Sequence, residues 1–237
     1  NTPPSPQGRP VIVQAGGSPR GIRASAVVAD HVFGDVMPLE QQVAHRAALD
    51  RELVSLGRNP DDVGVLWQTP IAVRETEREA IAHRDLLLST LRADGAGVYL
   101  SYHAGYDFST LPASFTLREL QAAIIATNAS PMGFVRKLAL KLGADTVVRR
   151  DEFFEHGLLA ATQHENTLAG TPAQVADELE RRFEATGSRG GFMIGQCIAV
   201  MSDLEAAVTL LIPELQRRGR FRTAYASRTL RDTLAET

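Results

Sequence analysis

The first third of the chain alternates short apolar runs with longer stretches in which apolar residues recur at helical spacing. The apolar runs predict strands at 10–15, 31–36 and 63–73, and the stretches between and after them predict helices at 18–29, 38–57 and 75–91. Strands that alternate with helices in this way favour parallel pairing through right-handed helical crossovers. We therefore expect an α/β fold, with the first strand buried on both faces.

The alternation stops at residue 97 and resumes near residue 170, so 97–169 is interpreted as an insertion. Within it we predict an aromatic loop over 99–108 and helices near 116–126 and 131–142. After it, Thr171 and Gln174 form a capping-box pattern that opens a helix. A further buried strand is predicted at 191–195. A last helix is expected from Ser202 to Gly219, capped through Glu205.

Composition and charge exclude several classes of partner. The 237 residues carry a net charge of -3 with both signs mixed along the chain, which predicts neither nucleic-acid nor membrane binding. The single cysteine, Cys197, excludes an internal disulfide and a cysteine-rich metal site, and it fits a reducing cytoplasm. The chain starts without Met in a proline-rich segment, so we expect it to be part of something longer.

The segment 10–21 is the strongest candidate for chemistry. It runs from an apolar strand through Gly16 and Gly17 to Ser18, a helix N-cap, with Pro19 in the first helical position. Bare glycine backbone and unpaired amides at a helix N-terminus attract an anion, and a phosphate would suit the turn. A tight strand-to-helix turn without a ligand fits the same residues.

Three blocks in order resemble flavin-dependent monooxygenases of the bacterial luciferase-like superfamily. The blocks are 6–16, 170–177 and 208–223. The resemblance is to the branch of nitrilotriacetate, long-chain alkane and dibenzothiophene-sulfone monooxygenases, and 229–231 also resembles the ending of that family.

The resemblance implies a TIM (β/α)8 barrel. The matching blocks look like its C-terminal half, strands five to eight, with 97–169 inserted before the last strand over the active-site face. Residues 1–10 would then be a linker from an N-terminal half that is absent from the chain, and 1–237 would be one part of a single barrel domain. The chain alone is then expected to be an incomplete enzyme.

The resemblance also implies the reaction. We expect reduced FMN from a separate flavin reductase, molecular oxygen and a small organic substrate, in a cytoplasmic homo-oligomer. One alternative is an F420-dependent oxidoreductase of the same superfamily. Others are a non-catalytic half-barrel subunit that completes a partner's fold, and an unrelated phosphate-binding α/β module.

In such a barrel Ser18, with the neighbouring backbone of Gly16, Gly17 and Ala15, would hold the FMN phosphate. Gln14 ends the same strand and would either meet the flavin or be a buried, hydrogen-bonded side chain. His103, within the insertion, is the candidate catalytic residue, because a histidine near neutral pH can act as acid or base. A paired or exposed loop histidine is the alternative.

The remaining candidates have plainer interpretations. Tyr102 and Tyr106 would wall a substrate pocket or pack the insertion. No metal site is expected, since the histidines and carboxylates match no common ligand spacing. His31, His45 and His83 are interpreted as surface residues. His156 and His164 lie beside glutamates and are interpreted as part of a solvated face. Cys197 follows the last strand, and Trp67 is interpreted as a core or pocket residue.

Overall fold

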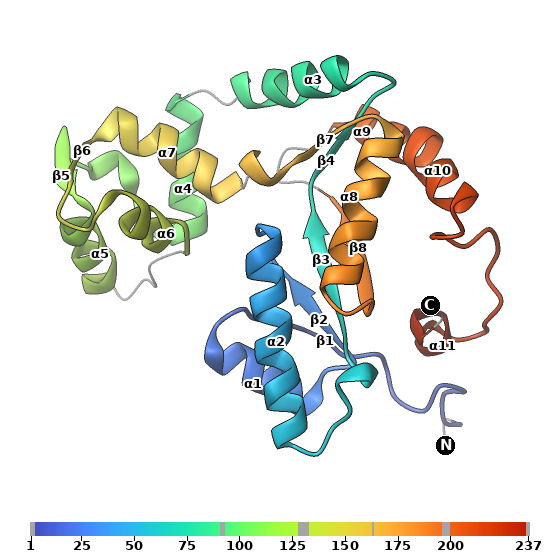
Figure 1. Ribbon diagram of the computed structural model, residues 1–237. Helices are drawn as coiled ribbons and strands as arrows, with labels where there is room; N and C mark the ends of the chain where they lie inside the picture. Colours follow the sequence, from blue (N-terminus) through green and yellow to red (C-terminus); the bar gives the residue numbers. More distant parts are fainter. Residues whose placement is uncertain (1–2, 91–92, 128–132, 163, 196–199, 236–237) are drawn as a thin grey trace. The chain divides into compact units, whose positions relative to one another are not determined.

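The computed structural model describes residues 3–90, 93–127, 133–162, 164–195 and 200–235, and it divides the chain into two compact units (Figure 1). We call Asn1–Ala82 with Asn166–Thr237 the sheet unit, and His83–Glu165 the helical unit. The helical unit begins earlier than the insertion predicted at 97–169. Helix α3, Glu77–Ser89, contains the boundary between the two units.

The sheet unit is built from strands and helices in alternation. Its strands are β1 (Val13–Ala15), β2 (His31–Gly34), β3 (Gly64–Thr69), β4 (Ile71–Val73), β7 (Leu168–Gly170) and β8 (Gly190–Ile194). Its helices are α1 (Pro19–Val28), α2 (Leu39–Ser55), α8 (Pro172–Ala185), α9 (Met201–Ala206), α10 (Ile212–Arg217) and α11 (Leu230–Ala235). One π-helical turn, Ala207–Leu211, joins α9 to α10. The α/β class expected from the sequence is confirmed.

The central sheet has four parallel strands in the order β1, β2, β3, β8. Strands β1, β2 and β3 are neighbours in chain order. Strand β8, orange in Figure 1, lies beside β3 although more than a hundred residues separate them. This sequential order, with helices between successive strands of the sheet, is the order of a (β/α) barrel and differs from the reversing order of a doubly wound sheet.

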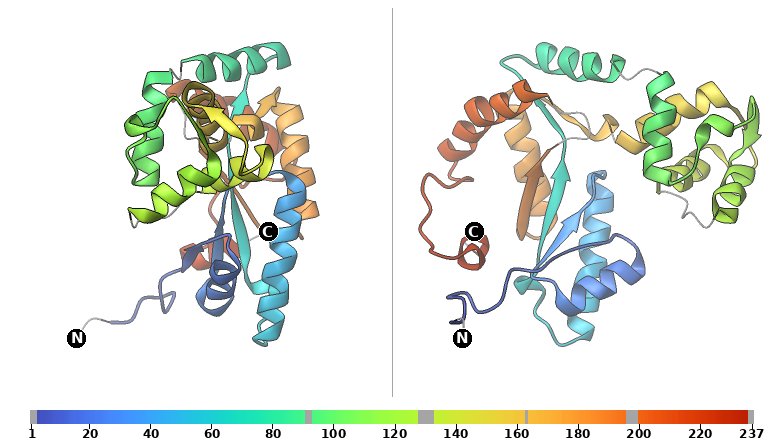
Figure 2. Two further views of the ribbon diagram at one scale, coloured as in Figure 1. Left: turned by 90° about the vertical axis from the view of Figure 1, so that its left-hand side faces the viewer. Right: turned by 180° about the vertical axis from the view of Figure 1, so that it is seen from behind.

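One face of this sheet is covered by helices. Val32, Val65 and Trp67 point from β2 and β3 into a core with residues of α1 and α2, and the views in Figures 1 and 2 show α2 beside these strands. A second core joins β4 to α8 and to the π-helical turn, and Phe192 of β8 packs against both cores. The helices named here therefore share one face.

The other face of the central sheet is open within the described part of the sheet unit. Ala15, Phe33, Leu66 and Gly191 are in register across the four strands and share that face. Phe33 is 40% exposed, and Val13, on the same face, is 46% exposed. The expectation that the first strand is buried on both faces is wrong for this chain by itself, because nothing in the described part of the sheet unit covers this side.

Two sequence-based boundaries in the sheet unit are also wrong. The run 63–73 is two strands, since Pro70 lacks an N–H and its carbonyl accepts from Leu168, so β4 pairs with β7 instead of extending the sheet. The last helix begins after Val200, and the Ser202–Glu205 capping box is not formed. The box at Thr171 and Gln174 is present, as predicted.

The helical unit has its own core. Its elements are α4 (Ala93–Ala104), β5 (Ser114–Thr116), α5 (Leu117–Ala126), α6 (Gly133–Leu142), β6 (Val147–Arg149) and α7 (Arg150–Thr162), with β5 and β6 antiparallel. Phe108, Phe115 and Phe153 stack near its centre. The loop predicted over 99–108 is wrong in its first half, because residues 99–104 belong to α4.

Candidate cofactor-phosphate site

The loop between β1 and α1 lies at the carboxyl end of the parallel strands, which is where α/β folds of this kind bind their ligands. Ser18 is the N-cap of α1, and its Oγ accepts a hydrogen bond of 3.1 Å from the N–H of Gly21. Pro19 occupies the first helical position, as the sequence predicted. The hydroxyl of Ser18 is exposed and retains its own proton for donation outward.

The glycines of this loop are required by its geometry. Gly16 has φ 145°, a conformation that disfavours a side chain. A Cβ on Gly21 would stand 2.9 Å from the backbone of Gly16, so the loop folds directly onto the first turn of the helix. Gly17 has open space where a Cβ would project. The result is a short stretch of bare, solvent-facing backbone.

Backbone donors remain available there. The N–H groups of Gly17, Ser18 and Arg20 make no hydrogen bond to any residue that the structure describes. Unpaired N–H groups at a helix N-terminus carry partial positive charge and favour an anion. The geometry fits a phosphate oxygen better than a neutral ligand.

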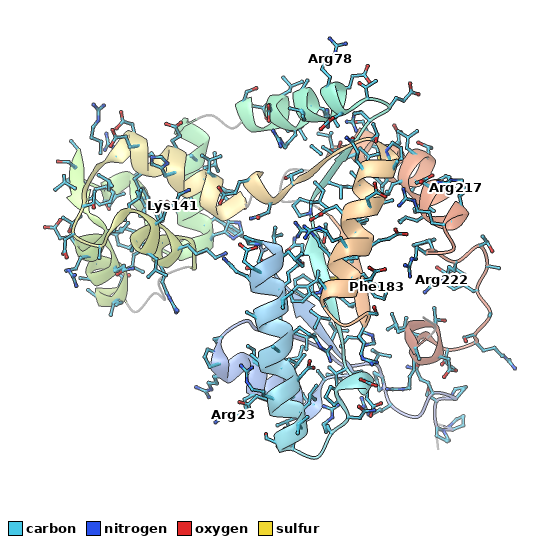
Figure 3. All side chains as sticks on the ribbon, viewed as in Figure 1. Arg23, Arg78, Lys141, Phe183, Arg217 and Arg222 are labelled. Carbon is cyan, nitrogen blue, oxygen red and sulfur yellow. The ribbon has the colours of Figure 1, made fainter. Side chains whose placement is uncertain are left out.

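Arg20 is a member of this loop that the sequence analysis did not identify. It is exposed in the first turn of α1, where the helix dipole disfavours a cation, and that turn has no acidic residue. No described residue forms an ion pair with Arg20. In contrast, Arg23, which lies one turn further along the helix and is labelled in Figure 3, forms an ion pair with Glu52, with 3.4 Å between Nε and Oε2. A cation in a first helical turn beside glycines is the signal that would have identified Arg20.

Gln14 and Ala15, the other predicted contributors, lie at the end of β1. Gln14 is half-buried, and its Nε2 donates to the carbonyl of Ala15 at 2.8 Å. Gln14 is in register with Val32, so it lies on the helix-covered face of the sheet. Ala15 lies on the open face with Phe33.

His103 lies in the helical unit, on the last turn of α4 and not in a loop as predicted. Its exposed ring stacks against Tyr99, with ring centroids 4.5 Å apart, and meets the edge of Tyr102 at 5.3 Å. Tyr102 is 84% exposed, whereas Tyr106 packs edge-on against Phe108 in the core of the unit. His103 and the Ser18 loop belong to different units.

Two histidines predicted to lie on the surface are buried or half-buried. His45 is 8% exposed and lies against Trp67, which is a core residue. Burial, followed by the charge of Arg46, lowers the pKa of His45. His31 begins β2 and is half-buried, and burial lowers its pKa, while Asp30 and Arg231 have smaller, opposing effects.

The other titratable candidates contribute no site among the described residues. His83 is half-buried on α3, and His156 is exposed on α7 beside Glu155. Among the residues that the structure describes, no group of three or more potential ligands is arranged to hold a metal ion. Cys197 and the side chain of His164 lie outside the described residues. No described helix has the length and apolar character needed to cross a membrane.

Comparisons with known proteins give independent information on the family. Dibenzothiophene-sulfone monooxygenase from Rhodococcus erythropolis is 30% identical over 232 residues, which are 98% of this chain and 50% of that protein. The crystal structure of a long-chain alkane monooxygenase matches 98% of this chain and 46% of its own, with a TM-score of 0.71 and 26% identity. The chain thus spans about half the length of the curated relatives it matches.

A third match is structural. The crystal structure of a riboflavin lyase, solved with modified FMN and riboflavin, covers 100% of this chain with a TM-score of 0.75 at 24% identity, and it supports the fold alone. The family model that describes luciferase-like monooxygenases matches residues 1–190. The resemblance noted in the sequence is confirmed, and the chain belongs to the luciferase-like monooxygenase family.

Proposed function

We propose that this chain is the C-terminal half of a (β/α)8 barrel, strands five to eight, and that it binds the phosphate of FMN in a flavin-dependent monooxygenase. The observation that carries the proposal is the Gly16–Arg20 loop at the carboxyl end of a parallel sheet, in a chain of this family. Active sites of (β/α)8 barrels lie at this end of the strands.

The open face of the sheet supports the half-barrel. Parallel sheets are normally covered on both faces, yet Val13 and Phe33 remain exposed on one face. In a closed barrel that face becomes the packed interior. An N-terminal half that supplies strands one to four is the partner that this surface requires.

The helices at the two ends of the sheet support the same partner. In α1, the first helix, Val27 is 57% and Val28 is 50% exposed. In α9 and the π-helical turn that follows β8, Leu204 is 57% and Val208 is 53% exposed. Exposed apolar residues gathered at both ends are typical of an interaction surface, and the first and fourth helices of the missing half would cover them.

The loop residues fit the cofactor that the family implies. The FMN phosphate is a dianion near neutral pH, and the loop offers N–H groups, the hydroxyl of Ser18 and the guanidinium of Arg20. Gly16 and Gly17 bring no side chain between the backbone and a ligand. Reduced FMN, when bound, supplies the electrons that activate molecular oxygen for transfer of one oxygen atom to a small organic substrate.

The protein's own contribution is binding, orientation and exclusion of water. Ser18 and Arg20 fix the phosphate and so orient the rest of the cofactor over the carboxyl ends of the strands. We propose His103 as the acid or base on the helical unit, with 97–169 as the insertion over the active-site face. The chain is further proposed to work in the cytoplasm, as a homo-oligomer, with a separate flavin reductase.

The test is oxygen uptake by the completed barrel. The chain is combined with an N-terminal half of its own protein, supplied with photoreduced FMN, and oxygen consumption and substrate oxidation are recorded. Oxygen uptake coupled to product supports the monooxygenase. Hydride transfer from reduced F420 without oxygen uptake would identify the alternative oxidoreductase. Absence of both activities, with FMN bound only by the joined halves, would indicate a non-catalytic subunit.

A further inference from the structure

Helix α2 changes character along its buried side. Towards its C-terminus the buried residues are Leu49 and Leu53, which pack in the core of the sheet unit. Towards its N-terminus the buried residues are Gln42, which is 0% exposed, and His45. Residues three and four apart lie on one face of a helix, so the buried face of α2 is polar near its N-terminus and apolar near its C-terminus.

The polar end of this stripe contains unpaired atoms. Both amide atoms of Gln42, Nε2 of His45 and Nε1 of Trp67 are buried without a hydrogen-bond partner among the described residues. The neighbouring Arg46 differs, since its guanidinium donates to the carbonyls of Val63 and Pro60. Buried polar atoms are nearly always satisfied, so four orphaned atoms in one region call for an occupant.

Two of these side chains come from α2 and the third comes from β3. Gln42 and His45 are one turn apart on the buried side of α2. The ring of His45 meets the ring of Trp67 edge-on, with centroids 5.5 Å apart. Gly34 of β2 lies under Trp67, because a Cβ there would stand 2.4 Å from the indole. The indole therefore packs against Gly34 of the sheet on one side and contacts His45 of α2.

The hydrogen-bonding character of the four atoms indicates which kind of molecule could pair with them. The indole N–H and the Gln42 amide nitrogen only donate, the Gln42 oxygen only accepts, and a neutral His45 Nε2 does one or the other. An anion would leave the acceptors unpaired, and a cation would face N–H groups beside the guanidinium of Arg46, which already pairs with Asp50. A small neutral molecule that both donates and accepts satisfies the whole set.

We propose that Gln42, His45 and Trp67 form an internal water site between α2 and the sheet. One or more ordered water molecules accept from the indole N–H and the amide nitrogen, and donate to the amide oxygen. Such water is part of the packed structure and fixes the first turns of α2 against β3. The site is separate from the Ser18 loop and does not depend on the proposed cofactor.

The experiment uses the only tryptophan of the chain, which gives one indole N–H signal. The protein is labelled with ¹⁵N-tryptophan, and cross-relaxation between the indole N–H and water is measured in the rotating frame, where its sign separates direct contact from proton exchange. Gln42→Leu is compared with Val43→Leu, a matched change at an exposed neighbour on the same helix.

A direct water signal in the wild type and in Val43→Leu, lost in Gln42→Leu, is the expected result. Absence of the signal in the wild type overturns the proposal, and this measurement stands even if Gln42→Leu fails to fold. A signal that survives in Gln42→Leu shows that Gln42 does not hold the water and also overturns the proposal. A higher urea midpoint for Gln42→Leu would mark a dry, unpaired amide and contradict it too.

Discussion

Asp30 joins the two ends of the sheet unit, and its neutralisation gives the sharpest stability prediction. Its carboxylate accepts two bonds of 2.7 Å from Arg9, one of 2.8 Å from Arg231 and one of 2.8 Å from the N–H of Ile12. Arg231 belongs to α11, which lies close to the N-terminal segment in Figure 2. Asp30 therefore holds both terminal segments at the start of β2.

The size of the effect follows from exposure. The side chain of Asp30 is 14% exposed, that of Arg231 is 31% exposed and that of Arg9 is 55% exposed. A hydrogen bond to a charged group contributes about 1.5–3 kcal/mol when protected, and an exposed ion pair contributes about 0–1 kcal/mol. Asp30→Asn keeps the volume but removes the charge, so we expect a loss of about 2–3 kcal/mol, mostly through Arg231.

The pH dependence has a defined sign. Burial raises the pKa of Asp30, but hydrogen bonds from Arg9, Arg231 and Ile12 outweigh burial and hold the pKa well below its usual value. The stabilisation is thus fully present above the unfolded pKa of about 3.9 and is lost as the pH falls through the lower folded pKa. The difference between wild type and Asp30→Asn should be constant from pH 7 to 5 and shrink below about pH 4.

Urea unfolding followed by Trp67 fluorescence measures the free energy of unfolding of wild type and Asp30→Asn, because the only tryptophan is buried in the sheet unit and reports on that unit. The matched control is Asp61→Asn, since Asp61 lies in the same unit and pairs with Arg189, but its side chain is 55% exposed. A loss for Asp30→Asn no larger than that for Asp61→Asn would refute the reasoning.

Other predictions concern single residues. Because burial lowers the pKa of His45, stability should fall as pH decreases below about 6.5, and His45→Gln should flatten that urea-midpoint profile; an unchanged profile contradicts this. Thr171→Ala should cost about 1 kcal/mol in chemical unfolding through loss of the α8 cap, whereas Ser202→Ala should cost little, because Val200 is the N-cap there. His103→Ala should lower turnover of the completed enzyme more than its FMN affinity, and equal turnover would leave His103 with no catalytic role.

Local signals predicted much of the fold. The capping box at Thr171 depends on residues three apart, and the left-handed Gly57 after α2 depends on one residue, so neither needs tertiary information. The parallel order followed from strand and helix alternation. The loop of the candidate site was predicted in the same way, because glycines, an N-cap and a proline in the first helical position are local signals.

Tertiary contacts explain the features of the structure that the sequence did not predict. Gly97 marks the point where the strand and helix alternation stops, yet it lies within α4, and a Cβ there would stand 3.3 Å from Phe154, so the glycine allows α4 to pack closely. His45 looked like a surface residue on a polar helix, but the buried side of α2 is itself polar at that end. The exposed Val13 looked buried, because the sequence pattern of a strand does not show whether its covering partner lies in the same chain.

The most direct test of the proposed phosphate site compares FMN with riboflavin, which lacks the phosphate, in the completed protein. Ser18→Gly removes the hydroxyl but retains most of the cap, since glycine costs only a few tenths of a kcal/mol at an N-cap. We expect this variant to bind FMN about 10- to 100-fold more weakly than the wild type and to bind riboflavin with unchanged affinity. Equal affinities of wild type and variant for FMN would contradict the assignment of the Ser18 loop as the phosphate site.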